Sequence, residues 1–304
     1  MPANENRPDV YTRITDKIVT ALEQGARPWT QPWNAEHLAG RITRPRRATG
    51  EAYRGINVIM LWMEAYERGY AAPVWMTFRQ ALALEAHVRK GEKGSLVVYA
   101  NKITRTEQDA NGDDYELEIP FLKGYTVFNV EQIEGLPAHY YAKQEPAAPI
   151  TAVDRVAHAD TFLESTGASV VHGGNVASYN VGTDLIRMPP IDTFRDAPSY
   201  YAVRAHETIH WTRHKSRLDR SFGREKWGDE GYAREELVAE LGSAFICADL
   251  DLTPEIRDDH AAYIASWIKV LQNDKRAVFQ AAAHAQRAAD YLHNLQPGAA
   301  AKAA

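Results

Sequence analysis

Residues 197–214, APSYYAVRAHETIHWTRH, contain the pattern HExxH at His206, Glu207 and His210. Two histidines four residues apart on an α-helix project from the same face, so both imidazoles can bind one metal ion. The glutamate between them is placed to act as a general base beside that ion. The pattern predicts a helix that begins near Pro198 and carries a site of the zinc-metallopeptidase type.

A catalytic zinc site needs a third protein ligand and one open position. The periodic segment GYAREELVAELGSAFICADL, residues 231–250, predicts a second helix, whose first turns hold Glu235, Glu236 and Glu240. Glu236 and Glu240 lie one turn apart on one face, so either carboxylate could complete the site. A solvated helix surface that binds no metal is the alternative interpretation of the same residues.

Three tyrosines are close enough in the sequence to donate a hydrogen bond in a transition state, namely Tyr200, Tyr201 and Tyr232. Tyr232 is the candidate that we favour, and core packing is the other role open to each ring. The single cysteine, Cys247, lies in the apolar run AFICADL and is expected to be a buried, inert thiol. One cysteine cannot form an intramolecular disulfide.

These residues predict metal-assisted hydrolysis of a peptide. Zn²⁺ would make water more acidic and polarise the scissile carbonyl, and Glu207 would pass the proton to the leaving amine. The segment ASYNVGTDLIRMP, residues 177–189, is expected to be the edge strand that pairs with an extended peptide. A nuclease is less favoured, because nucleases use oxygen-rich Mg²⁺ or Mn²⁺ sites.

Length and composition indicate an α+β chain of two domains, since 304 residues exceed a usual single domain and 45% are hydrophobic. Apolar periodicity predicts helices at residues 9–24, 55–68, 77–86 and 153–166. Leu96–Tyr99 and Gly124–Val130 read as hairpin strands, with Asn111-Gly112 as the turn. We expect a nucleic-acid-binding domain at 1–138, a linker at 139–152, a metallopeptidase domain at 153–296 and a disordered tail at 297–304.

The N-terminus lacks the apolar stretch of a secretory signal, and no run of about eighteen apolar residues occurs. We therefore expect a cytoplasmic protein with no membrane partner. Residues 1–106 contain 16 Lys and Arg against 10 Asp and Glu, whereas the remaining residues contain 19 against 30. The basic first third favours a polyanionic partner, and a solvated basic face is the plainer alternative.

Single-stranded DNA sites combine cations that follow the backbone with aromatic faces on which bases stack. Both kinds of residue are interleaved here, and the candidates are Trp29, Trp33, Arg41, Arg44, Arg46, Arg47, Tyr53, Arg54, Lys90 and Lys93. Trp29 and Trp33 stand beside prolines and are expected on the surface. Trp62 and Trp75 are expected in the core.

Several motifs in one order resemble the plasmid antirestriction proteins of the ArdC type over nearly the whole chain: PWTQPW, YRGINVIMLW, VWMTFRQA, VRKGEKG, YTVFN, MPP, YYAVRAHETIHWTRH, RLDR and YAREELVAELGSAFICADL. The resemblance implies an N-terminal domain that binds single-stranded DNA and a zincin-like domain similar to SprT-type proteases. It also implies that the protein protects conjugating plasmid DNA from host restriction enzymes.

The string ELVAELGSAF resembles the second zinc helix of thermolysin-like gluzincins. That resemblance implies Glu236 as the third ligand and Glu240 as a carboxylate that orients a zinc histidine. The swapped assignment, with Glu240 on the metal, stays open, because the twenty-five residues between His210 and Glu236 depart from the gluzincin pattern. Zn²⁺ is the expected ion, with Mn²⁺ as another divalent candidate. Two functions follow: a DNA-tethered metallopeptidase, or a DNA-binding antirestriction factor whose metal site is structural.

Overall fold

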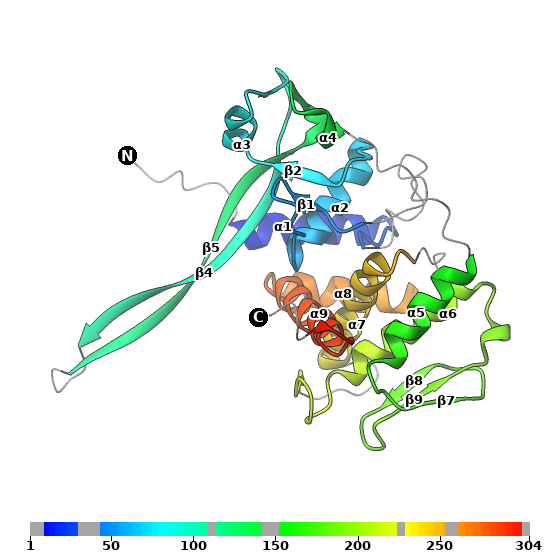
Figure 1. Ribbon diagram of the computed structural model, residues 1–304. Coiled ribbons are helices and arrows are strands. Elements are labelled where there is room, and N and C mark those ends of the chain that lie inside the picture. The colour runs from blue at the N-terminus through cyan, green and yellow to red at the C-terminus, as the bar shows by residue number, and fades with distance from the viewer. Residues whose placement is uncertain are drawn as a thin grey trace.

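The protein was analysed as a computed structural model, which describes residues 9–29, 43–108, 113–141, 152–223, 229–252 and 261–299. Helices and strands are mixed in both halves of the chain, which confirms the α+β class (Figure 1). None of the described helices is both long and apolar enough to cross a lipid bilayer.

The N-terminal half is built on a four-stranded sheet of order β1-β2-β5-β4. A separate two-stranded sheet pairs β3 with β6. The elements are α1 (Val10–Glu23), β1 (Arg46–Arg47), α2 (Ile56–Arg68), β2 (Val74–Met76), α3 (Phe78–Ala83), β3 (His87–Val88), β4 (Ser95–Gln108), β5 (Asp114–Asn129), the 3₁₀ helix η3 (Val130–Gln132), β6 (Ile133–Glu134) and α4 (Ala138–Tyr141). The predicted helices at 9–24, 55–68 and 77–86 are confirmed.

Local sequence explains where α1 begins and ends. Asp9 caps the helix by accepting a hydrogen bond from the Thr12 amide at 2.9 Å. The apolar stripe that includes Ile14 and Ile18 is fully buried. Gly25 ends the element at φ 77°, a left-handed conformation that glycine adopts without strain.

Strands β4 and β5 form a long hairpin that extends away from the rest of the molecule (Figure 1). The antiparallel register runs from Ser95 opposite Val127 to Gln108 opposite Asp114. The sequence predicted this hairpin with much shorter strands. Its predicted turn, Asn111-Gly112, lies outside the described residues.

The C-terminal half contains a three-stranded sheet of order β7-β9-β8 and a group of long helices. Its elements are α5 (Ala152–Glu164), β7 (Val170–His172), β8 (Ser178–Asn180), β9 (Leu185–Met188), the 3₁₀ helix η4 (Ile191–Thr193), α6 (Ala197–Trp211), α7 (Glu230–Asp249), α8 (Ala261–Asn273) and α9 (Ala277–Asn294). The segment 177–189 forms two strands, β8 and β9, rather than the single edge strand expected. In the order β7-β9-β8, β9 is the central strand, so within this segment only β8 lies at an edge of the sheet.

One hydrophobic core runs through both halves. It includes Ile18 and Trp62 from the first half and Phe245 and Trp267 from the second. Helix α1 packs on α8, and α2 packs on α9. The proposed linker at 139–152 and tail at 297–304 lie largely outside the described residues, so these domain boundaries remain predictions.

Candidate metal centre

The two site helices, α6 and α7, pack closely against each other. Asp196 caps α6 by accepting from the Ser199 amide at 2.7 Å, and Pro198 lies in the first turn, as helix starts favour. On α7, Gly242 faces Ile209 of α6, and a Cβ at Gly242 would lie 2.9 Å from three atoms of that side chain. Glycine therefore allows the approach that brings the two helices' polar residues together.

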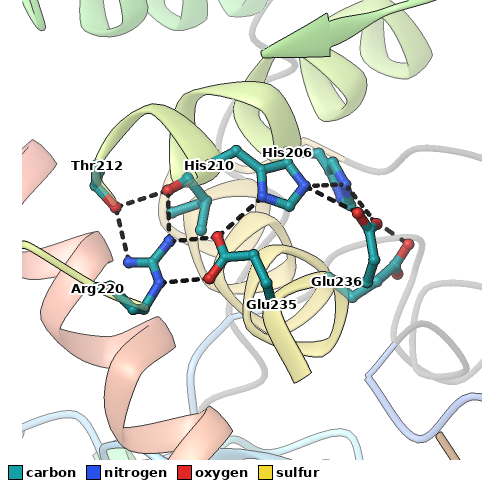
Figure 2. A network of polar contacts seen from close by, with 8 residues as sticks. His206, His210, Thr212, Arg220, Glu235 and Glu236 are labelled. Carbon is teal, nitrogen blue, oxygen red and sulfur yellow. Dashed lines mark hydrogen bonds and ion pairs between the residues drawn. The ribbon is translucent and has the colours of Figure 1, made fainter. Parts of the chain in front are cut away.

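Three side chains from these helices converge (Figure 2). His206 Nε2 lies 3.1 Å from His210 Nε2, and each of these atoms lies 3.5 Å from a carboxylate oxygen of Glu236. Ligand atoms about 2.0–2.1 Å from a tetrahedral Zn²⁺ lie about 3.4 Å from one another. Two imidazoles and one carboxylate at these separations fit a tetrahedral divalent ion, whose fourth position would take solvent or substrate.

Glu235 holds the outer nitrogen of His210. Its Oε1 accepts from His210 Nδ1 at 3.0 Å and from Arg220 Nη2 at 2.8 Å, and its Oε2 accepts from Arg220 Nε at 2.8 Å. Arg220 also donates to Thr212 Oγ1 and to the Ile209 carbonyl (Figure 2). A protonated Nδ1 leaves the Nε2 lone pair of His210 directed at the metal position.

Neither the role of Arg220 nor that of Glu235, beyond its place on the second helix, was predicted from the sequence. Burial raises the pKa of Glu235, but the hydrogen bonds from Arg220 and His210 outweigh it and bring that pKa to about 2. The carboxylate is therefore charged at every physiological pH. The sequence signal that could have identified Glu235 is its position next to Glu236. Adjacent residues of a helix point in different directions, so Glu235 reaches a different side of the site from Glu236.

Glu240 approaches His206 from the other side of that ring. Its Oε1 lies 3.9 Å from His206 Nδ1, whereas Glu236 faces Nε2. Its Oε2 lies 3.4 Å from Trp29 Nε1 and 3.7 Å from Arg27 Nη1. This geometry favours Glu236 as the ligand and Glu240 as the carboxylate behind a histidine, and it disfavours the swapped assignment.

The site is strongly electronegative. Burial lowers the pKa of His210, but hydrogen bonds to Glu235 and Glu236 raise it to about 10. Burial likewise lowers the pKa of His206, and contact with Glu236 raises it above its ordinary value. Burial raises the pKa of Glu236, but the two histidines bring it well below the usual range. Positive charge is thus stabilised at this position, as a divalent ion requires.

The remaining candidate catalytic residues lie around this cluster. Glu207 is buried between the two histidines on α6. Tyr232 has its hydroxyl 3.3 Å from that of Tyr263, and burial, Tyr263 and the nearby Glu236 charge all raise the pKa of Tyr232. Tyr232 therefore stays protonated and able to donate a hydrogen bond.

The other two tyrosines and the cysteine pack in the interior. Tyr200 and Tyr201 are buried in the core, and Tyr200 makes a 2.8 Å hydrogen bond with His172. Cys247 is buried, and burial raises its pKa to about 12, which confirms the expected inert thiol.

Three of the predicted DNA-binding residues, Trp29, Arg44 and Tyr53, are buried, so the prediction that they contact DNA was wrong. Trp29 is fully buried, with its ring 5.6 Å from that of Trp267, because its proline-flanked segment turns inward onto α8. Arg44 is also buried. It donates to Asp249 through Nε and Nη2, each at 2.8 Å, and its guanidinium lies 4.6 Å from the centre of the Phe245 ring.

The other predicted contacts are spread over several surfaces. Tyr53 is buried beneath Arg47. The exposed cations are Arg46, Arg47, Arg54, Lys90 and Lys93, and Arg54 is paired with Asp290. Trp33 and Arg41 lie outside the described residues. Trp62 and Trp75 are buried, as predicted.

Comparison with known proteins agrees with the geometry of both halves. Residues 157–284 match the family model of a zincin-like metallopeptidase, and residues 8–128 match that of the N-terminal domain of anti-restriction factor ArdC. The fold and site therefore define a two-domain protein with a zincin-like domain, a class that indicates a divalent metal.

Similar proteins extend the match over nearly the whole chain. A metal-free crystal structure of the antirestriction protein ArdC from plasmid R388 has 46% identity and a TM-score of 0.78, with 95% of this chain and 98% of that chain covered. A Mn(II)-bound structure of the same protein has 44% identity, a TM-score of 0.76 and the same coverage. This chain belongs to the ArdC-type antirestriction protein family, which confirms the resemblance seen in the sequence.

Two further relatives are similar over their aligned parts. The uncharacterized protein y4eC of Sinorhizobium fredii (strain NBRC 101917 / NGR234) is 44% identical, with 96% of this chain and 94% of that protein covered. A DNA primase TraC of Escherichia coli is 38% identical over 93% of this chain, but the chain spans only 27% of that protein's length.

Proposed function

We propose that this protein is an antirestriction factor that binds single-stranded DNA and carries a zinc-dependent or manganese-dependent peptidase site. It would protect incoming plasmid DNA from host restriction enzymes. The observation that carries the peptidase part is the convergence of His206, His210 and Glu236 on one point. The Mn(II)-bound relative supports a divalent ion of this kind, and the imidazole-rich ligand set suits Zn²⁺ equally well.

The chain's own residues divide the chemistry among them. When bound, a divalent ion polarises a scissile carbonyl and makes water more acidic. Glu207, one residue from His206 on the same helix, accepts the proton from water and delivers it to the leaving amine. Tyr232 donates a hydrogen bond to the developing oxyanion. Glu235 and Glu240 hold the two imidazole rings in place from behind.

Three full-length variants test the peptidase assignment. Glu207→Gln should bind the metal as wild type does. Its activity on an unfolded protein substrate should fall by at least about a hundredfold, since general acid–base catalysis contributes about 10²–10⁴-fold to the rate. Glu236→Gln should lose the metal, measured by elemental analysis after dialysis. Glu230→Gln, on the exposed first turn of α7, is the matched control and should change neither. Normal metal content in Glu236→Gln would reject this ligand set.

A second function rests on a different observation. Glu240, behind His206, also contacts Arg27 and Trp29 of the N-terminal half, so a metal at this site would brace the contact between the two halves. The protein could then act by occupying DNA, with the metal in a structural role. A restriction-protection assay separates the two functions. Glu207→Gln abolishes protection if hydrolysis is required, and it leaves protection intact if the metal is structural.

A further inference from the structure

The β4–β5 hairpin leaves the body of the protein shortly after its base. Asn57 of α2 holds the base, because its side chain accepts from the Val98 amide at 2.7 Å and donates to the Val98 carbonyl at 2.8 Å. The neighbouring strand β2 pairs with β5 only at Phe128 and Asn129. Beyond these anchors the hairpin projects as a two-stranded arm (Figure 1).

The two faces of this arm differ in chemistry. Side chains alternate along a strand, so the odd-numbered residues of both strands share one face. That face, here called the aromatic face, carries the cross-strand pairs Val97/Tyr125, Tyr99/Lys123, Asn101/Phe121, Ile103/Ile119 and Arg105/Leu117. Beyond Leu122 the opposite face carries polar residues, namely Lys102 and the pairs Thr104/Glu118, Thr106/Glu116 and Gln108/Asp114.

Large apolar side chains on the aromatic face are exposed to an unusual degree. Tyr99 is 47% exposed, Tyr125 41% and Ile103 56%. Ile119 and Leu117 are also exposed, and together the five side chains present on the order of 400 Å² of apolar surface. A patch of this size on one face of a projecting element marks an interaction site.

Charge distinguishes the kind of partner. The aromatic face carries the cations Lys123 and Arg105 against the carboxylate of Glu107. Lys123 Nζ lies 5.2 Å from the centre of the Tyr125 ring. The opposite face carries one lysine against three carboxylates, Asp114, Glu116 and Glu118. A polyanion is therefore attracted to one face of the arm and repelled by the other.

The aromatic rings suit nucleobases better than a second protein surface. Tyr99 lies 6.4 Å from Phe121 and 6.4 Å from Tyr125, centroid to centroid, in edge-on contacts. In edge-on contacts the rings do not stack on one another, and Tyr99 and Tyr125 stay 47% and 41% exposed. A stable protein interface buries about 800 Å² per partner, roughly twice what this face offers. Rings flanked by cations on a narrow ribbon are the features of a sequence-tolerant single-strand site.

We infer that the aromatic face of the β4–β5 arm binds single-stranded DNA, with bases on Tyr99, Phe121 and Tyr125 and phosphates near Lys123 and Arg105. The inference rests on the proposed DNA-binding function and supplies a site for it. Three of the candidates chosen from the sequence, Trp29, Arg44 and Tyr53, are buried and cannot contact a DNA strand.

Fluorescence anisotropy of the full-length protein with a labelled oligo(dT) tests the inference. The double variant Tyr99→Ala/Phe121→Ala should weaken binding by about 25-fold or more, because each stacked ring contributes at least about fivefold. Lys123→Ala should reduce the slope of log affinity against log salt by about 0.7. Thr104→Ala/Thr106→Ala, on the opposite face of the same arm, is the matched control and should bind as wild type does.

Each other result counts against the arm. Wild-type binding that survives in Tyr99→Ala/Phe121→Ala, and is lost instead on charge reversal at Arg46 and Arg47, overturns the arm site while DNA binding stands. A wild type that binds no oligo(dT) removes the DNA-binding function and this inference together. If light scattering shows a wild-type dimer that Tyr99→Ala/Phe121→Ala converts to a monomer with unchanged DNA affinity, the face serves self-association. Unchanged thermal unfolding of each variant excludes misfolding as the cause.

Discussion

Replacing Glu235 with glutamine probes the network behind His210. The carboxylate uses Oε1 for both His210 and Arg220 and Oε2 for Arg220 alone. Glutamine has one acceptor oxygen, so its amide group must point a donor at either the Arg220 guanidinium or the His210 Nδ1–H. One buried donor, on Arg220, loses its acceptor if the amide nitrogen takes the Oε2 position, and two donors lose theirs if it takes the Oε1 position, where it faces both His210 Nδ1 and Arg220 Nη2.

The size of the effect follows from burial. The side chains of Arg220 and Glu235 are 1% and 2% exposed, and removing one partner of a buried pair costs about 3–5 kcal/mol. The pKa of Glu235 falls from 4.5 to about 2, which corresponds to about 3 kcal/mol and agrees with that range. Metal affinity should fall about 10–100-fold, because the orientation of His210 is no longer fixed.

Urea unfolding of the metal-free protein and calorimetric metal titration measure the two effects separately. Glu230→Gln is the control on the same helix, since the Glu230 side chain is 54% exposed, Arg234 keeps Asp274 as a partner, and a surface pair contributes about 0.2–1 kcal/mol. A Glu235→Gln variant that unfolds within about 1 kcal/mol of wild type and binds the metal with unchanged affinity would refute a stabilising role for this carboxylate. The stabilisation has a defined pH window. The pKa of Glu235 is lower in the folded protein than in the unfolded chain, so its charged carboxylate stabilises the fold fully above pH 4.5. This stabilisation is lost as the pH falls through about 2.

Three further substitutions have expected outcomes. Gly242→Ala should lower the free energy of unfolding by about 1–3 kcal/mol, because its Cβ would meet Ile209 at 2.9 Å; a gain in urea midpoint would contradict this. Trp29→Phe removes the donor to Glu240 and should lower the free energy of unfolding by about 1 kcal/mol in the same assay. A variant as stable as wild type would show that this hydrogen bond does not stabilise the protein. His284→Gln should be about 2 kcal/mol more stable than wild type at pH 5 and as stable as wild type at pH 8. Burial lowers the pKa of His284 to about 4, so the unfolded chain takes up a proton more readily than the folded protein once the pH drops below 6.5. Equal stability of the two proteins at both pH values would refute this.

Features set by short-range spacing were predictable from the sequence. His206 and His210 share a helix face because they are four residues apart, and the acidic segment ending in Glu240 was recognisable as a second site helix from its own periodicity. The helices at 9–24, 55–68 and 77–86 followed from apolar patterning in the same way. These are statements about one element at a time, and periodicity suffices for them.

Features that depend on distant partners were not predictable. Prolines beside Trp29 indicated a surface loop, but Trp267, far along the chain, offers its ring an apolar contact that outweighs this preference. Arg44 looked like one cation in a basic cluster until Asp249 and Phe245 were placed beside it. Arg220 lies in the charged connection after α6, where no periodic pattern distinguishes a buried arginine from a solvated one.

The contacts across the two halves determine how the protein can be dissected. Helix α7 supplies Glu236 to the candidate metal centre, Glu240 to Trp29 and Asp249 to Arg44. Cutting the chain between the halves would leave Arg44 without its carboxylate and expose the Trp29 ring, and loss of one buried charge partner alone costs about 3–5 kcal/mol. That is a large share of the roughly 5–15 kcal/mol by which proteins are stable. Substitutions in the intact chain, rather than isolated halves, can therefore separate DNA binding from hydrolysis.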